Sequence, residues 1–150
     1  MTLKDKINED LKTALKSGDK IRVNTIRSVR ALILEFEKSG SGKVLDEQEE
    51  IKLLSGAAKK RKESIEQFRN AGRNDLAEKE EAELKILMDY LPKQLDEIQI
   101  RQEVAKIAGE INAGSKEDFP RLMPEVMKSL KGKADGNVIR REVEKFLGIQ

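Results

Sequence analysis

The stretch from Lys59 to Asp89, KKRKESIEQFRNAGRNDLAEKEEAELKILMD, reverses its charge halfway along. Its first half, up to Arg73, carries six basic and two acidic residues, and its second half, from Asp75, carries six acidic and two basic residues. Apolar positions recur at helical spacing in both halves, and Ala71-Gly72 separates them. Two oppositely charged helices joined by a short turn favour antiparallel packing, because each neutralises the other. We therefore predict a helical hairpin.

The same stretch supports two other interpretations. The basic half is a candidate phosphate-binding stripe formed by its six basic residues, Lys59, Lys60, Arg61, Lys62, Arg69 and Arg73. The acidic half suggests a metal or acid–base site at Glu80, Glu81 and Glu83. Helix positions one and three apart do not all converge on one point, so we expect a solvated face there instead. The self-complementary hairpin and the phosphate-binding stripe both remain open.

The remainder of the chain shows the same period of apolar residues, which indicates seven helices, no strands and no internal repeat. Aspartates precede several of these helices as expected N-caps, and glycines follow them. Pro120 suits a first helical turn, whereas Pro124 lacks an N–H that a regular helix uses, so a kink or a late start is expected there. The expected caps are Asp19, Asp46, Asp75 and Asp96, Ser115 or Asp118 starts the penultimate helix, and the expected stops are Gly18, Gly72 and Gly114.

The composition excludes several chemistries. Charged residues make up 39% of the 150 residues and aromatic residues only 3%. The absence of Cys and His excludes disulfides, thiolate zinc sites, imidazole ligands and a histidine base. The formal charge is only +2, so a nucleic-acid partner has to be met by a local basic face. No cofactor is expected.

The N-terminal sequence, MTLKDKINEDLK, alternates charged and apolar residues. No uncharged run approaches the roughly 20 residues that cross a bilayer. We therefore expect a cytoplasmic protein with no membrane partner.

The stretch from Lys131 to Glu142, KGKADGNVIRRE, is a candidate anion site. Gly132 and Gly136 allow close approach of the backbone, and the N–H groups at the start of the following helix point outward. Asp135 would repel a phosphate unless it serves as an N-cap, so a tight turn with a capping aspartate is the alternative. Nucleotide hydrolysis has no support, because no phosphate-loop pattern is present. The basic candidates are Lys131, Lys133, Arg140 and Arg141.

Three motifs in order resemble those of the GatB/YqeY family: AGR-x-DL (Ala71 to Leu76), YLP-x-QL (Tyr90 to Leu95) and GKADG (Gly132 to Gly136). The resemblance covers practically the whole chain. It implies an all-α fold with an N-terminal domain of longer antiparallel helices, residues 1–93, and a small C-terminal three-helix bundle, residues 94–150. Pro120 and Pro124 stand where small residues are typical of the family, and Lys128 where proline is common.

In that family the domain occurs alone, as the tail of the GatB subunit of tRNA-dependent amidotransferase, and on some glutaminyl-tRNA synthetases. The resemblance therefore implies a non-catalytic tRNA-binding accessory protein that recognises tRNA shape and backbone, with an amidotransferase or glutaminyl-tRNA synthetase as partner and no role for DNA. Carried over residue by residue, the RNA-binding candidates are Lys59, Arg61, Lys62, Arg73, Lys128, Lys131, Gly132, Lys133, Gly136, Arg140 and Arg141.

Two other functions remain open. The first is a helical protein–protein interaction module with no RNA role. The second is glutamine-dependent carbon–nitrogen ligase activity, which follows only from the family label inherited from GatB. The chain has no His, no Cys and no nucleotide-binding motif, so we expect no catalysis and assign no catalytic or metal-binding residue.

Overall fold

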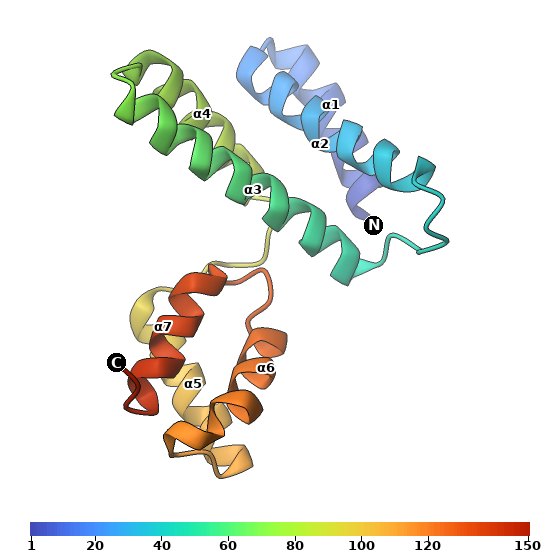
Figure 1. Cartoon of the computed structure of the whole chain (residues 1–150). Coiled ribbons are helices and arrows are strands. Elements are labelled where there is room, and N and C mark those ends of the chain that lie inside the picture. The colour runs from blue at the N-terminus through green and yellow to red at the C-terminus, as the bar shows by residue number, and fades with distance from the viewer. The chain divides into compact units, whose positions relative to one another are not determined.

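The computed structural model describes all 150 residues and contains only helices (Figure 1). The all-α prediction is therefore confirmed, as are its seven α-helices. The chain divides into two compact units, Met1–Leu91 and Pro92–Gln150. No helix is both long and apolar enough to span a membrane. The elements are α1 (Leu3–Ser17), α2 (Lys20–Lys38), α3 (Glu47–Asn70), α4 (Asn74–Met88), α5 (Glu97–Ile111), a 3₁₀ turn η1 (Lys116–Asp118), α6 (Phe119–Ser129) and α7 (Gly136–Phe146).

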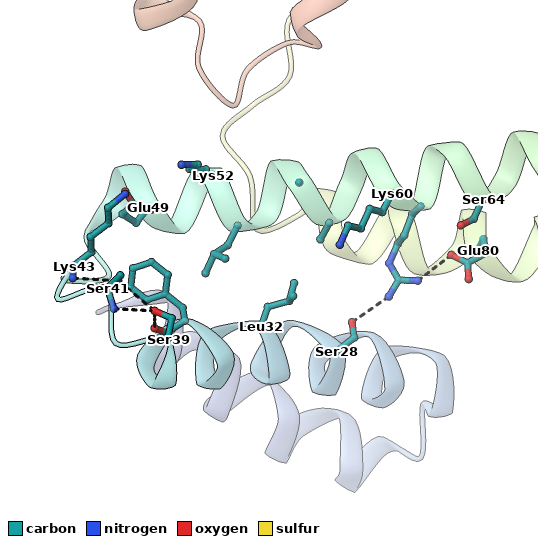
Figure 2. A pocket seen from close by; sticks show the side chains of 15 residues that line it. Ser28, Leu32, Ser39, Ser41, Lys43, Glu49, Lys52, Lys60, Ser64 and Glu80 are labelled. Carbon is teal, nitrogen blue, oxygen red and sulfur yellow. Dashed lines mark hydrogen bonds and ion pairs between the residues drawn. The ribbon is translucent and has the colours of Figure 1, made fainter.

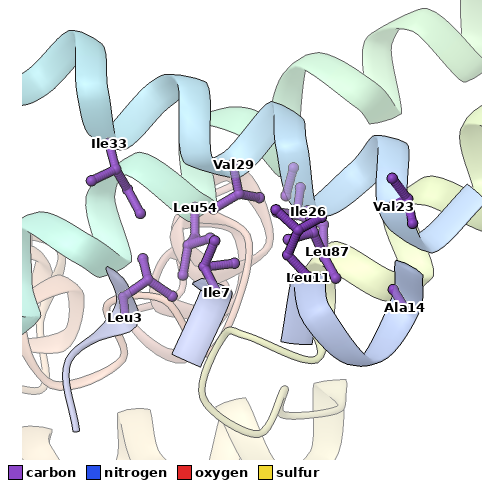
Figure 3. Packing of buried hydrophobic residues seen from close by; sticks show 11 residues of the cluster. Leu3, Ile7, Leu11, Ala14, Val23, Ile26, Val29, Ile33, Leu54 and Leu87 are labelled. Carbon is purple, nitrogen blue, oxygen red and sulfur yellow. The ribbon is translucent and has the colours of Figure 1, made fainter. Parts of the chain in front are cut away.

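The N-terminal unit consists of two helical hairpins, α1–α2 and α3–α4. Between α1 and α2, Gly18 adopts a left-handed conformation with φ of 73°, and the Asp19 side chain accepts a hydrogen bond from the N–H of Arg22. Both residues act as predicted. Leu54 of α3 and Leu87 of α4 join the buried apolar residues of the first hairpin (Figure 3). The two hairpins therefore share one hydrophobic core.

The turn between α3 and α4 corrects one predicted cap. The N–H of Arg73 donates to the carbonyl of Phe68 at 2.8 Å, and α4 starts directly afterwards at Asn74. Asp75 therefore lies inside the first turn and does not cap the helix. Its carboxylate pairs with Arg73 at 3.3 Å and also suits the positive end of the helix dipole.

The C-terminal unit packs α5, α6 and α7 around a second apolar core. The first of these helices ends at Ile111, and Asn112, with φ of 53°, takes the left-handed position that we expected two residues later at Gly114. The helix α6 begins at Phe119 and continues through Pro124. The irregular backbone that we expected near these prolines is the 3₁₀ turn η1, which directly precedes the helix. The buried set is Ile100, Val104, Ile107, Ala108, Ala113, Leu122, Val126, Leu130, Ile139, Val143 and Leu147.

Asp118 fastens the end of α5 to the start of α6. Its carboxylate accepts hydrogen bonds from the N–H groups of Gly114 and Ser115 at 2.8 and 3.0 Å, and from the guanidinium of Arg121 at 2.9 Å. Arg121 also donates to the carbonyl of Ile111 at 3.2 Å. These donors hold the pKa of Asp118 well below its usual 3.8, and the two N–H groups contribute most to the lowering.

Because the folded-state pKa of Asp118 is lowered, its stabilising effect is present above the unfolded pKa and is lost as the pH falls towards the folded value. We expect the unfolding free energy of the C-terminal unit to decrease between about pH 5 and pH 2, and to decrease less in Asp118→Asn. Thermal unfolding of both proteins across this range measures the difference. Parallel pH curves would show that Asp118 makes no such contribution.

Candidate nucleic-acid interface

The turn between α6 and α7 has the conformation of a capped helix–helix turn. Gly132 has φ of 76°, and the N–H of Lys133 donates to the carbonyl of Leu130 at 2.9 Å. The Asp135 side chain accepts from the N–H of Asn137 at 2.8 Å and so caps α7. Its carboxylate occupies the N-terminus of the helix, where a phosphate was the alternative, and would repel an anion there. The capping interpretation of this turn is therefore confirmed.

A distant segment of the same unit is hydrogen-bonded to this turn. The N–H of Leu95 donates to the carbonyl of Lys133 at 2.9 Å, and the Gln94 side-chain amide donates to the carbonyl of Gly132 at 2.7 Å. These bonds hold the segment that carries Lys93, the neighbour of Gln94, against the turn that carries Lys131 and Lys133. Lys93 was not among the predicted residues, because no local pattern in the sequence indicates a pairing across 38 residues.

Four lysines consequently surround the turn, and together we call them the basic patch: Lys93, Lys128, Lys131 and Lys133. All four are exposed. None of them takes part in an ion pair, although α7 and the start of α6 contain several. The patch therefore presents four ammonium groups that form no ion pair within the protein, around a turn that also carries the capping carboxylate of Asp135.

The other candidates of this unit differ in their availability. Arg140 pairs with Glu144 at 2.9 Å, whereas Arg141 is exposed and forms no ion pair. Gly136 is the first residue of α7, and a β-carbon built there would lie 3.6 Å from the Met127 side chain. That is an ordinary packing distance, so close packing against α6 does not by itself require glycine at this position.

In the N-terminal unit, Arg61 is bound within the protein. Its guanidinium pairs with Glu80 at 3.1 Å and with Glu83, and donates to the Ser28 hydroxyl at 3.1 Å. The side chain is only 16% exposed. It therefore links α3 to both α4 and α2, and both of its terminal nitrogens are bonded to groups of the protein.

The remaining basic candidates of the N-terminal unit fall into two groups, those without an ion pair and those with one. Lys59 and Lys62 are exposed on α3 and form no ion pair, whereas Arg73 pairs with Asp75. Arg69 pairs with Glu81 across the hairpin. The cross-helix pairs of Arg61 and Arg69 support the self-complementary hairpin. The three glutamates suggested as a metal or acid–base site are each used in these pairs, and no cluster of acidic side chains is arranged to hold a metal ion.

These features define an all-helical protein of two compact units, and the C-terminal one carries a basic patch that forms no ion pair. Residues 4–147 match the family described as Yqey-like protein, and the chain belongs to this family. The family resemblance read from the three motifs is therefore confirmed.

Several curated relatives share one name, "Altered inheritance of mitochondria protein 41, mitochondrial". The relative from Pyrenophora tritici-repentis is 33% identical over 147 residues, which cover 95% of this chain and 80% of the relative. The relative from Kluyveromyces lactis is also 33% identical, over 92% of this chain and 72% of its own length. The relative from Lachancea thermotolerans is 40% identical over 57% of this chain and 46% of its own length.

The name of these relatives contradicts the expectation of a cytoplasmic protein, because it describes them as mitochondrial. The expectation rested on the lack of an apolar membrane-spanning run. That lack says nothing about which compartment a protein occupies, because targeting signals are recognised by receptors and are not encoded in the composition of a folded domain.

Proposed function

We propose that this protein is a non-catalytic accessory protein that binds tRNA through the basic patch of its C-terminal unit. The observation that carries the proposal is the gathering of Lys93, Lys128, Lys131 and Lys133 around one turn, where none of them forms an ion pair. Lysines of this kind bind phosphate groups as point charges and release counterions from the nucleic acid.

The proposed recognition is of backbone and shape. The chain has no Trp, one Tyr and four Phe, so it offers little for stacking on unpaired bases. Folded RNA presents its phosphates and 2′-hydroxyl groups in a defined geometry that lysines can follow without reading the bases. The family resemblance supplies tRNA as the RNA, and an amidotransferase or a glutaminyl-tRNA synthetase as the enzyme that the protein would assist. The name of the relatives describes them as mitochondrial, so we place the proposed role in that compartment.

Replacing Lys131 and Lys133 together by alanine is expected to lower the affinity for tRNA. The slope of log affinity against log salt concentration should become shallower by about one to two, since each phosphate contact contributes roughly 0.7 to 0.9. Fluorescence anisotropy with total tRNA at several salt concentrations measures both quantities, and duplex DNA of equal charge serves as competitor. Circular dichroism should be unchanged, because both side chains are exposed.

The matched control is Lys106→Ala with Lys116→Ala, which removes the same charge from exposed lysines of the same unit outside the basic patch. This control should bind tRNA as the unaltered protein does. An equal loss in both double variants would mean that tRNA senses only the net charge. Binding that prefers DNA would reject the proposal, and turnover of glutamine and ATP by the purified protein would reject its non-catalytic part.

A further inference from the structure

The N-terminal unit contains a groove of about 660 Å³ between α2 and α3 (Figure 2). Its floor is apolar. Leu32 and Phe36 contribute from α2, and Leu53 and Ala57 from α3, and all four side chains are only half-buried. Of these four residues, only Ala57 also packs against the shared core of the unit, which lies around residues such as Ile26 and Leu54. The groove is therefore apolar surface that the protein itself leaves uncovered.

Gly56 deepens the groove at its middle. It lies in the interior of α3, where glycine is less favourable than alanine by roughly 0.5 to 1 kcal/mol. Its backbone has no positive φ, and a β-carbon built there would have no heavy atom within 4 Å outside its own helix segment. Neither backbone conformation nor packing within this chain requires the glycine, and the missing side chain leaves the middle of the groove open.

Polar contacts cross the groove near both ends. At one end, the hydrogen bond from Arg61 to Ser28 crosses from α3 to α2 (Figure 2). At the other end, Lys43 pairs with Glu49 at 3.9 Å, beside the loop that carries Ser41. Along α3 the lining runs from Glu49 to Ser64, which at 1.5 Å per residue is about 22 Å. This length corresponds to about four turns of a helix.

The charge along the α3 rim is positive. Lys52, Gly56, Lys60 and Ser64 follow one another at intervals of four residues, so they form one row on the helix, and all line the groove. Arg61 and Lys43 are neutralised by glutamates of the protein. Lys52 and Lys60 are exposed and form no ion pair. A ligand that covers the apolar floor would therefore gain from acidic groups facing these two lysines.

We propose that the groove between α2 and α3 binds an amphipathic helix of another protein, about four turns long, with one apolar face and acidic residues along the edge that meets Lys52 and Lys60. An apolar face laid into a groove between two helices is an established mode of recognition. The charged rim would fix the orientation and favour acidic partners over basic ones. The proposal is independent of the proposed tRNA binding, because it uses only residues of the N-terminal unit.

The test uses the full chain and two synthetic 16-residue helical peptides. Both carry leucines at helical spacing on one face, and one carries glutamates along the edge where the other carries lysines. Fluorescence anisotropy should give saturable binding of the acidic peptide, with Kd below about 100 µM, and binding of the basic peptide at least about tenfold weaker.

Three variants make the test specific. Lys52→Glu with Lys60→Glu should reverse the preference, so that the basic peptide binds better. The control Lys59→Glu with Lys62→Glu makes the same change of charge on the same helix but outside the groove lining, and should retain the preference for the acidic peptide. Gly56→Phe should fill the groove and abolish binding of both peptides, while circular dichroism verifies the fold.

Equal binding of both peptides, or none below 1 mM (about 4 kcal/mol of binding energy), would overturn the proposal. The same holds if both charge-reversed variants behave alike. Sedimentation of the chain alone provides a further test. A dimer that Gly56→Phe abolishes would overturn the proposal, because the groove would then bind a second copy of this chain. Binding of dodecanoate in the groove without binding of either peptide would also overturn the proposal, because the ligand would then be a small anionic amphiphile.

Discussion

Arg61→Ala is expected to lower the unfolding free energy of the N-terminal unit by about 3 kcal/mol. The arginine is the partner of Glu83, whose side chain is only 11% exposed, and it also binds Glu80 and Ser28. Removing it leaves a largely buried carboxylate without a counter-charge, and that loss is more costly than the net stabilisation from the pair. Urea denaturation followed by circular dichroism measures the change.

Arg69→Ala is the matched control, because Arg69 also pairs across the hairpin, with Glu81, but its side chain is 53% exposed. It should cost no more than about 1 kcal/mol. Arg61→Met with Glu83→Leu should recover much of the stability, since neither substitution leaves a charge behind at that pair. If Arg61→Ala and Arg69→Ala had the same small effect, the assignment of Arg61 as a structural bridge would fail.

Leu122→Ala is expected to destabilise the C-terminal unit by about 3 kcal/mol, within the range of roughly 2 to 5 for buried leucines. The Leu122 side chain is 0% exposed in a small core built from three helices. Small units bury little apolar surface, so a loss of this size is a large part of their stability. Thermal unfolding should show this unit melting earlier.

The same variant also tests the proposed function. The basic patch depends on the hydrogen bonds that hold the segment of Gln94 and Leu95 to the α6–α7 turn. At temperatures where Leu122→Ala has unfolded this unit, the affinity for tRNA should fall with the helical signal. Ile98→Ala, at a residue that is 63% exposed, should change neither. If the unfolded unit bound tRNA as strongly as the folded one, tRNA binding would not depend on the folded basic patch.

The helices were predictable because their signals are local. Apolar spacing located all seven, and the side chains of Asp19, Asp46 and Asp96 cap helices as expected. The two wrong predictions concern the start of α4 and the end of α5, where the structure places the cap at another residue. Asp75 pairs with Arg73 inside a helix that begins one residue before it, and Asn112 ends a helix before Gly114 is reached.

The candidate site was predictable in part. The sequence identified Lys128, Lys131 and Lys133, and the structure adds Lys93 through a backbone contact from a distant segment. The capping role of Asp135, an open alternative in the sequence, is decided by its hydrogen bond to Asn137. RNA binding by the patch stays a prediction that the lysine variants test.

The sequence by itself determined the helical class, most of the helix ends and the family of this protein, because spacing, caps and motifs depend on residues close together in the chain. Only the tertiary structure decided which charges are free. Arg61 and Lys60 are adjacent and look equivalent in sequence, yet Arg61 is bound by glutamates of α4 and Lys60 is left unpaired beside an open groove. Ion pairing and surface shape depend on contacts between helices, and those contacts form only when the chain has folded.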